Sequence, residues 1–267
     1  YVFALNVIIS IYLQLNNVLL GFMKDTEAVG YFTAATKIMV ITMSISSALG
    51  AVIMPRTSNL IAEERMDEFK ALVQKSYDFI FALAMPLMVG LIFTSPSAVL
   101  LLSGEGFVPA ILTSQIVAFN ILTVGLSGVM GIQVLYPLGK INIVILCTSI
   151  GAIINVFLNV LLIPRYGHNG TAVAYMLAEM TVTVSMFFIG KRYIPIRFLK
   201  RQHLNYVLGS VVMGVCLYFI SWLGLGNTAT LVMMISMGGI VYVVILLFLR
   251  DSIGMIPWKI LREKFGK

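Results

Sequence analysis

Residues 151–190 decide how the rest of the chain can fold, and their sequence is GAIINVFLNVLLIPRYGHNGTAVAYMLAEMTVTVSMFFIG. Two apolar segments flank the polar turn at residues 164–170. Each segment has about the twenty apolar residues that a helix needs to cross the hydrocarbon core of a bilayer. The pattern therefore predicts two membrane-spanning helices joined by a short loop.

Both of these helices carry polar side chains at a depth where lipid offers no hydrogen-bond partner. Asn155 and Asn159 stand one turn apart on the first helix, so they share a face. Tyr175, Glu179 and Thr183 form a second stripe with the same spacing. An ionised carboxylate at this depth costs about 3 kcal/mol. We therefore expect Glu179 to face a protein interior or a water-filled cavity.

The composition extends this interpretation to the whole chain. Of the residues, 60% are apolar and 11% charged, and the mean hydropathy is +1.00. The apolar residues come in long blocks, which predicts an all-α, polytopic transmembrane bundle. Cys147 and Cys216 lie inside such blocks and are expected to be small buried hydrophobes. Because the sequence opens inside an apolar block without an initiator Met, we expect it to be the C-terminal part of a longer protein.

The basic residues between the apolar blocks predict the orientation in the membrane. Alternate connections carry fifteen Lys and Arg residues against two, so the positive-inside rule places both ends in the cytoplasm. An even number of spans agrees with this. The eight predicted spans are residues 1–23, 29–54, 72–93, 110–134, 141–163, 171–190, 206–225 and 229–249.

Several shorter segments complete the expected topology. Residues 59–75 have an amphipathic pattern, which predicts one helix at the cytoplasmic surface. Residues 97–106 are too short to span and are expected to form a helix and loop at the outer surface. In the first span, Gln14, Asn16 and Asn17 are expected to form interhelical hydrogen bonds. Asp78 lies just inside the third span, where it can reach the interface, and we assign it no special role.

Other function classes lack their sequence signatures. The net charge of +7 is spread between apolar blocks and forms no stripe for nucleic acid. His168 and His203 fall on opposite sides of the predicted membrane, so they cannot share a metal ion. The sequence has no Walker-type phosphate loop and no paired carboxylates within one span. We therefore favour transport over catalysis and expect no cofactor.

The candidate functional residues are the rare polar groups within the spans. Lys37 can attract a phosphate or diphosphate as a compact point charge, and Glu179 can exchange a proton and so couple transport to an ion gradient. The alternatives are a structural ion pair between these two residues and a Lys37 side chain that snorkels to the membrane interface. Asn155, Asn159 and Tyr175 are candidates for a substrate cavity, but the same amides can equally join two helices.

Three motifs resemble the oligosaccharide flippases of the polysaccharide transporter family. The first is VGYFTAATKI at residues 29–38, the second is Pro55-Arg56 at the end of that helix, and the third is IPRYGHNGTA at residues 163–172, which Glu179 follows. The family belongs to a superfamily that also contains the lipid II flippases and the multidrug MATE exporters. The resemblance extends over nearly the whole chain.

The resemblance implies both an organisation and a function. Residues 1–190 would be the second six-helix lobe, and residues 191–267 would add two transmembrane helices and a basic tail. Such proteins flip undecaprenyl-diphosphate-linked oligosaccharides across the cytoplasmic membrane by alternating access, with polysaccharide polymerase and assembly proteins as candidate partners. Lys37 would line the central cavity. The alternatives are a lipid II flippase, a cation-coupled drug exporter, and a membrane assembly component that transports nothing.

Overall fold

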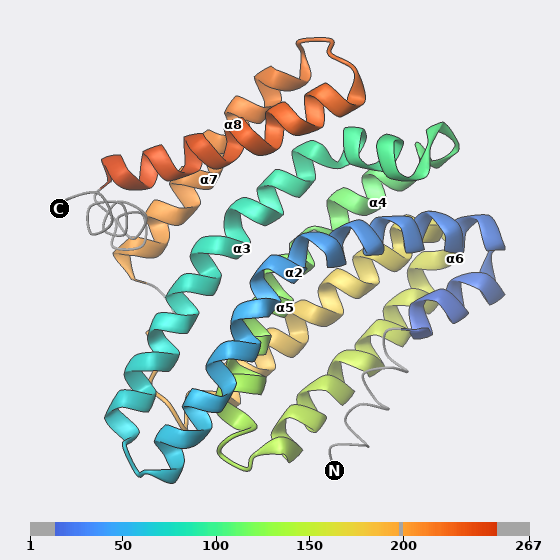
Figure 1. Ribbon diagram of the computed structural model, residues 1–267. Helices are drawn as coiled ribbons and strands as arrows, with labels where there is room; N and C mark the ends of the chain where they lie inside the picture. Colours follow the sequence, from blue (N-terminus) through green and yellow to red (C-terminus); the bar gives the residue numbers. More distant parts are fainter. Residues whose placement is uncertain (1–13, 198–199, 250–267) are drawn as a thin grey trace.

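The computed structural model describes residues 14–197 and 200–249, which form a bundle of long helices (Figure 1). Within these ranges the chain contains helices and no strand, which confirms the all-α prediction. Residues 14–23 are helical. The elements that follow are α2 (Thr26–Ala62), α3 (Met66–Ser103), the short η1 (Glu105–Phe107), α4 (Ala110–Val117), α5 (Phe119–Gly128), the π-helical η2 (Val129–Leu135), α6 (Ile141–Gly190), α7 (Arg201–Ser221) and α8 (Asn227–Phe248).

The described helices account for most of the predicted spans. Six are long and apolar enough to cross a membrane, and α4, α5 and η2 together form one of them. α6 counts as one of the six, although Gly167 divides it into two arms, which match two of the predicted spans. The eighth prediction, residues 1–23, lies mostly outside the described ranges. The chain is therefore a multi-pass membrane protein.

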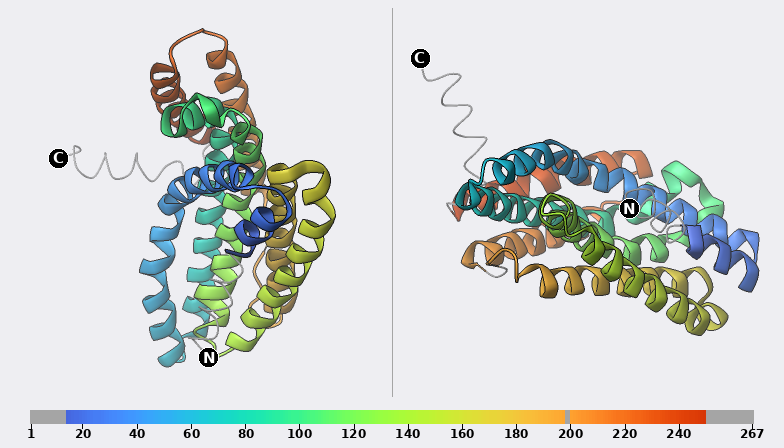
Figure 2. Two further views of the ribbon diagram at one scale, coloured as in Figure 1. Left: turned by 90° about the vertical axis from the view of Figure 1, so that its right-hand side faces the viewer. Right: turned by 90° about the horizontal axis from the view of Figure 1, so that it is seen from below.

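α6 is a helical hairpin, as the sequence of its turn predicts. Gly167 breaks the helix with a φ of 53° and a ψ of −131°, a conformation that suits glycine because it lacks a Cβ. The two arms run side by side in opposite directions (Figures 1 and 2). A Cβ on Gly151 would lie 2.2 Å from Val182 Cγ2, so the arms approach each other very closely there. The missing side chain makes this contact possible.

The bundle has two parts that meet at α3. On one side α3 packs with α2, α4 and α5, and these three helices in turn contact α6, around a core that includes Phe32, Ala35 and Ile121. On the other side α3 packs with both α7 and α8 through Ala82, Tyr206 and their neighbours. Figures 1 and 2 show the α7 and α8 pair lying against α3, away from α6.

The prediction of one surface helix at residues 59–75 is wrong. α2 continues to Ala62 and α3 begins at Met66, with the chain reversing direction between them. Glu64 adopts a φ of 58° at this reversal, and Arg65 forms ion pairs with Glu63 and Glu68 at 2.8 Å and 2.7 Å. The amphipathic pattern arises because the ends of two transmembrane helices each bury one face in the same apolar cluster.

The prediction for residues 97–106 is also wrong, because α3 continues through this segment to Ser103. Ser95 Oγ donates to Leu91 O at 2.6 Å and also contacts Ser114 Oγ of α4 at 3.1 Å. These buried contacts hold the last turns of α3 against α4. Gly104, with a φ of 87°, then ends the helix.

Candidate functional site

Three buried amides join the first helix to the first arm of α6. The Nδ2 atoms of Asn155 and Asn159 donate to Asn16 Oδ1 at 3.0 Å and 2.9 Å. Asn159 Nδ2 also contacts Asn155 O at 3.0 Å and Asn155 Oδ1 at 3.1 Å. The three residues are at most 1% exposed. The structure thus places both predicted amides of α6 in a contact between helices, and it confirms the interhelical role expected for Asn16.

The polar stripe of the second arm also faces the interior. Tyr175 and Glu179 are buried, and the Tyr175 ring packs edge to face on Phe32 of α2 with a centroid distance of 6.4 Å. Thr183 Oγ1 lies 2.9 Å from Thr123 O of α5 and 2.8 Å from Glu179 O. Glu179 therefore stands inside the part of the bundle that contains α6, next to α2 and α5, as its cost in lipid predicts.

Asn120 is a buried amide that the sequence analysis missed. Both polar atoms of its side chain lack a hydrogen-bond partner among the described residues, although Asn120 is fully buried. Asn120 precedes Thr123 by about one turn of α5, and Glu179 precedes Thr183 by one turn of α6. Because Thr183 donates to the Thr123 carbonyl oxygen, Asn120 lies near the depth of Glu179. The signal in the sequence is weak, because Asn120 is one of three amides in its apolar span, with Gln115 and Gln133.

Lys37 lies on a different surface from these groups. Its side chain is exposed on α2, whereas Glu179 is buried in α6. Ile41 and Ile45 follow it at intervals of one turn and are 63% and 56% exposed, so the three residues share one face of α2. The predicted site residues therefore occupy two places: the amides, Tyr175 and Glu179 are buried inside the bundle, and Lys37 lies on its surface.

The exposed face of α2 forms one wall of a large apolar groove. The groove has a volume of about 610 Å³ and lies between α2 and α3 on one side and α7 and α8 on the other. Among the residues that the structure describes, those that line the groove carry no charge. Its walls include Ile45, Leu87, Met213, Gly239 and Tyr242. Because Ile41 also lines the groove, Lys37 stands one helical turn beyond the lining on the same face of α2.

Three proteins or families have sequences similar to parts of this chain. A family model described as polysaccharide biosynthesis protein matches residues 1–112. A probable low-salt glycan biosynthesis flippase of Haloferax volcanii, Agl15, is 25% identical over 230 residues, which are 86% of this chain and 48% of that protein. An uncharacterized membrane protein of Methanocaldococcus jannaschii is 21% identical over 173 residues, covering 65% of this chain and 34% of that protein.

A solved structure shares the fold. The lipid II flippase MurJ in an inward closed conformation matches with a TM-score of 0.76 and 17% sequence identity, over 91% of this chain and 52% of that one. The chain thus spans about half the length of Agl15 and of the matched MurJ chain. The predicted resemblance to the flippases of the polysaccharide transporter family is thereby confirmed.

Proposed function

We propose that this chain acts as the second lobe and C-terminal helix pair of a flippase for undecaprenyl-diphosphate-linked oligosaccharides in the cytoplasmic membrane. In this proposal residues 1–190 form the lobe and residues 191–267 form the added helices and tail. The observation that carries the proposal is the apolar groove with a single lysine one turn beyond it on α2. No enzymatic step is proposed.

The apolar lining and the volume of the groove suit a long prenyl chain. Lipid tails are as apolar as the groove lining, so the hydrophobic effect offers little drive for a chain to leave the bilayer. A groove of about 610 Å³ can instead keep part of the chain in apolar surroundings beside the protein while the polar head moves. The lining residues of α3 and α8 provide such an apolar surface.

Lys37 supplies the complementary charge. An ammonium group is a compact point charge that attracts a diphosphate, and its attraction strengthens where the local dielectric is low. Its position one turn from Ile41 would hold a diphosphate at the end of a chain lying in the groove. The face of α2 thus offers apolar contact and charge in the order that a prenyl diphosphate requires.

Glu179 is proposed to couple transport to an ion gradient. Glu179 is a buried carboxylate one turn after Tyr175, and it can take up a proton when its surroundings change during alternating access. Glu179→Gln should therefore spare folding and weaken the dependence of flipping on a proton gradient. Flipping that keeps its full gradient dependence in this variant would remove Glu179 from the coupling step.

The test of the function is a flipping assay on purified protein that includes the first lobe. A fluorescent undecaprenyl-diphosphate oligosaccharide is placed in proteoliposomes, and a membrane-impermeant quencher reports its movement. Lys37→Arg should keep flipping, whereas Lys37→Gln should slow it about tenfold or more, because a contact to a charged group is lost. Lys24→Gln, another exposed lysine, is the matched control and should flip normally.

Four outcomes would contradict the role of Lys37 or favour another function. Equal rates for Lys37→Gln and the wild type would contradict the role of Lys37. Movement of lipid II in preference to other lipid-linked sugars would favour a lipid II flippase, and movement of a cationic drug would favour an exporter. A folded wild-type protein that moves none of them under a proton or sodium gradient would favour a non-transporting assembly component.

The proposed orientation, with both ends in the cytoplasm, can be tested separately. A cysteine introduced at Glu105 should react with a membrane-impermeant thiol reagent added outside cells, while one at Gln202 should react only after permeabilisation. The prediction follows from the basic residues of the connection at residues 191–201. The reverse pattern would overturn the orientation.

A further inference from the structure

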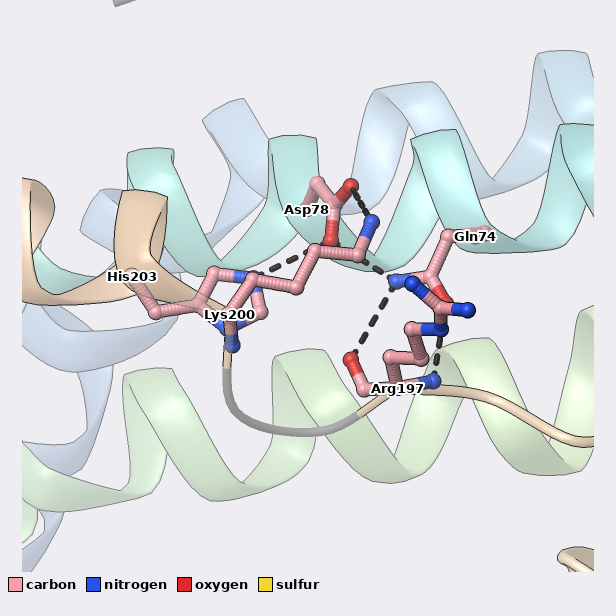
Figure 3. Close-up of polar contacts among 5 residues, drawn as sticks. All are labelled: Gln74, Asp78, Arg197, Lys200 and His203. Carbon is pink, nitrogen blue, oxygen red and sulfur yellow. Dashed lines mark hydrogen bonds and ion pairs between the residues drawn. The ribbon is translucent and has the colours of Figure 1, made fainter.

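A polar cluster joins α3 to the connection that leads into α7 (Figure 3). Asp78 of α3 is buried, and its carboxylate accepts from Lys200 Nζ at 2.6 Å, from His203 Nε2 at 3.0 Å and from Gln74 Nε2 at 2.8 Å. Gln74 Oε1 in turn accepts from the backbone N–H of Arg197 at 2.9 Å. These five residues are called the Asp78 cluster below.

The histidine of the cluster has a defined hydrogen-bonding role on each side of its ring. Nδ1 accepts from the backbone N–H of Lys200 at 3.2 Å, so we assign the ring proton to Nε2, which donates to Asp78. The ring is 2% exposed and packs against Phe81 with a centroid distance of 4.8 Å. His203 therefore links the first turn of α7 to α3 in one fixed geometry.

Asp78 also lies next to the point where α8 is attached. Ala82 follows Asp78 by one turn of α3, and its carbonyl oxygen accepts from Tyr242 Oη of α8 at 2.6 Å. Ala82 and Tyr242 both line the groove. A Cβ on Gly209 of α7 would lie 3.2 Å from the Tyr242 ring, so α7 and α8 are in close contact at the same level.

We propose that the Asp78 cluster is a positioning element that fixes the α7 and α8 pair against α3 and thereby sets the width of the groove. The contacts above support the first part, that the cluster holds the helix pair in place. The second part, that groove width matters for a prenyl chain, rests on the proposed function. The side chains of Lys200 and Asp78 are 26% and 11% exposed, so each partly buried charge is compensated by the other. The pair therefore favours the position in which Lys200 and α7 lie against α3.

Spin labels can measure the position of the helix pair directly. In purified protein that includes the first lobe, with Cys147 and Cys216 replaced by alanine, one label pair joins Ala71 of α3 to Val244 of α8. A reference pair joins Ala71 to Leu146 of α6. None of these three label sites lines the groove. Asp78→Asn should add a population with longer distances for the first pair and leave the reference pair unchanged.

Conservative and matched variants separate positioning from general instability. Lys200→Arg keeps the charge and should give the wild-type distance, whereas Lys200→Gln should resemble Asp78→Asn. Asp67→Asn, which removes an exposed acid from the same helix, should change neither distance. If Asp78→Asn does not fold, Lys200→Gln provides the same test. An unchanged distance from α3 to α8 in a folded Asp78→Asn or Lys200→Gln protein would overturn the proposal.

A second measurement connects position to transport. Flipping of a probe with an undecaprenyl chain should fall in Asp78→Asn, while flipping of a probe with a short prenyl chain should change much less. Equal losses for both probes would overturn the link to groove width. A wild-type protein that flips neither probe would contradict the proposed function alone, because the distance measurement would still decide whether the Asp78 cluster positions the helix pair.

Discussion

The two sides of α3 use polar groups in opposite ways. On the side of α6, the amides of Asn16, Asn155 and Asn159 bond to one another deep inside the bundle, where helices approach closely. On the side of α7 and α8, the described polar contacts to α3 lie at one end, around Asp78 and Ala82, and an apolar groove lies along the rest. The helices on the α6 side are therefore in close contact, whereas those on the α7 and α8 side leave a groove between them.

The difference shows that burial of a polar residue in a membrane protein does not by itself mark a ligand site. The amides of α6 have each other as partners, which is the usual reason for polar residues between transmembrane helices. The groove, by contrast, has almost no polar lining and is a better candidate for a lipid ligand.

The closed side should tolerate added volume least. Gly151→Ala places a Cβ 2.2 Å from Val182 Cγ2, so it should destabilise the protein by about 1–3 kcal/mol. Thermal unfolding in detergent measures the effect. Adding Val182→Ala should recover part of the loss, because it removes the clashing methyl group. A Gly151→Ala protein as stable as the wild type would show that the two arms are less tightly packed than described.

The amide contact should have a smaller but measurable effect. Asn16→Ala removes the acceptor shared by Asn155 and Asn159, and interhelical hydrogen bonds in membranes contribute about 0.6–1.7 kcal/mol. The melting temperature should fall, while flipping per folded molecule should be retained. Asn17→Ala is the matched control, since within the described residues Asn17 Oδ1 accepts a single long bond, of 3.4 Å, from Thr33. Lost flipping with unchanged stability would instead indicate amides that bind sugar.

The groove should accept added volume with the least change in stability. Gly239 lines the groove, and no atom lies within 4 Å of a Cβ built on it. Gly239→Phe should therefore change stability by no more than about 0.5 kcal/mol and yet slow the flipping of a long prenyl probe. Val232→Phe, on an exposed part of α8 outside the groove, is the control. Normal flipping by Gly239→Phe would separate the groove from transport.

The sequence predicts the features of this protein that depend on local pattern. Long apolar blocks give the spans, and the turn at residues 164–170 gives the α6 hairpin because Gly167 allows a positive φ. The cost of a charge in lipid predicts that Glu179 faces inward. The ends of α2 and α3 are mispredicted because the buried faces of two helices that meet at a reversal have the same periodicity as one surface helix.

Long-range pairing explains what the sequence could not predict. Asp78 and His203 are 125 positions apart, and neither lies in a motif, so nothing local indicates their contact. The groove likewise depends on how α7 and α8 dock on α3. For Asn155 and Asn159 the sequence leaves two uses open, and the contact with Asn16 becomes visible only when the helices are packed.

Photocrosslinking can show whether the groove and Lys37 hold the lipid-linked substrate. An undecaprenyl diphosphate with a diazirine in its prenyl chain is irradiated with the purified protein, and mass spectrometry locates the modified residues. We expect labels on groove residues such as Ile45, Leu87 and Met234, reduced by Gly239→Phe and by Lys37→Gln but not by Lys24→Gln. Labels that avoid these residues, or that persist unchanged in both variants, would contradict the account.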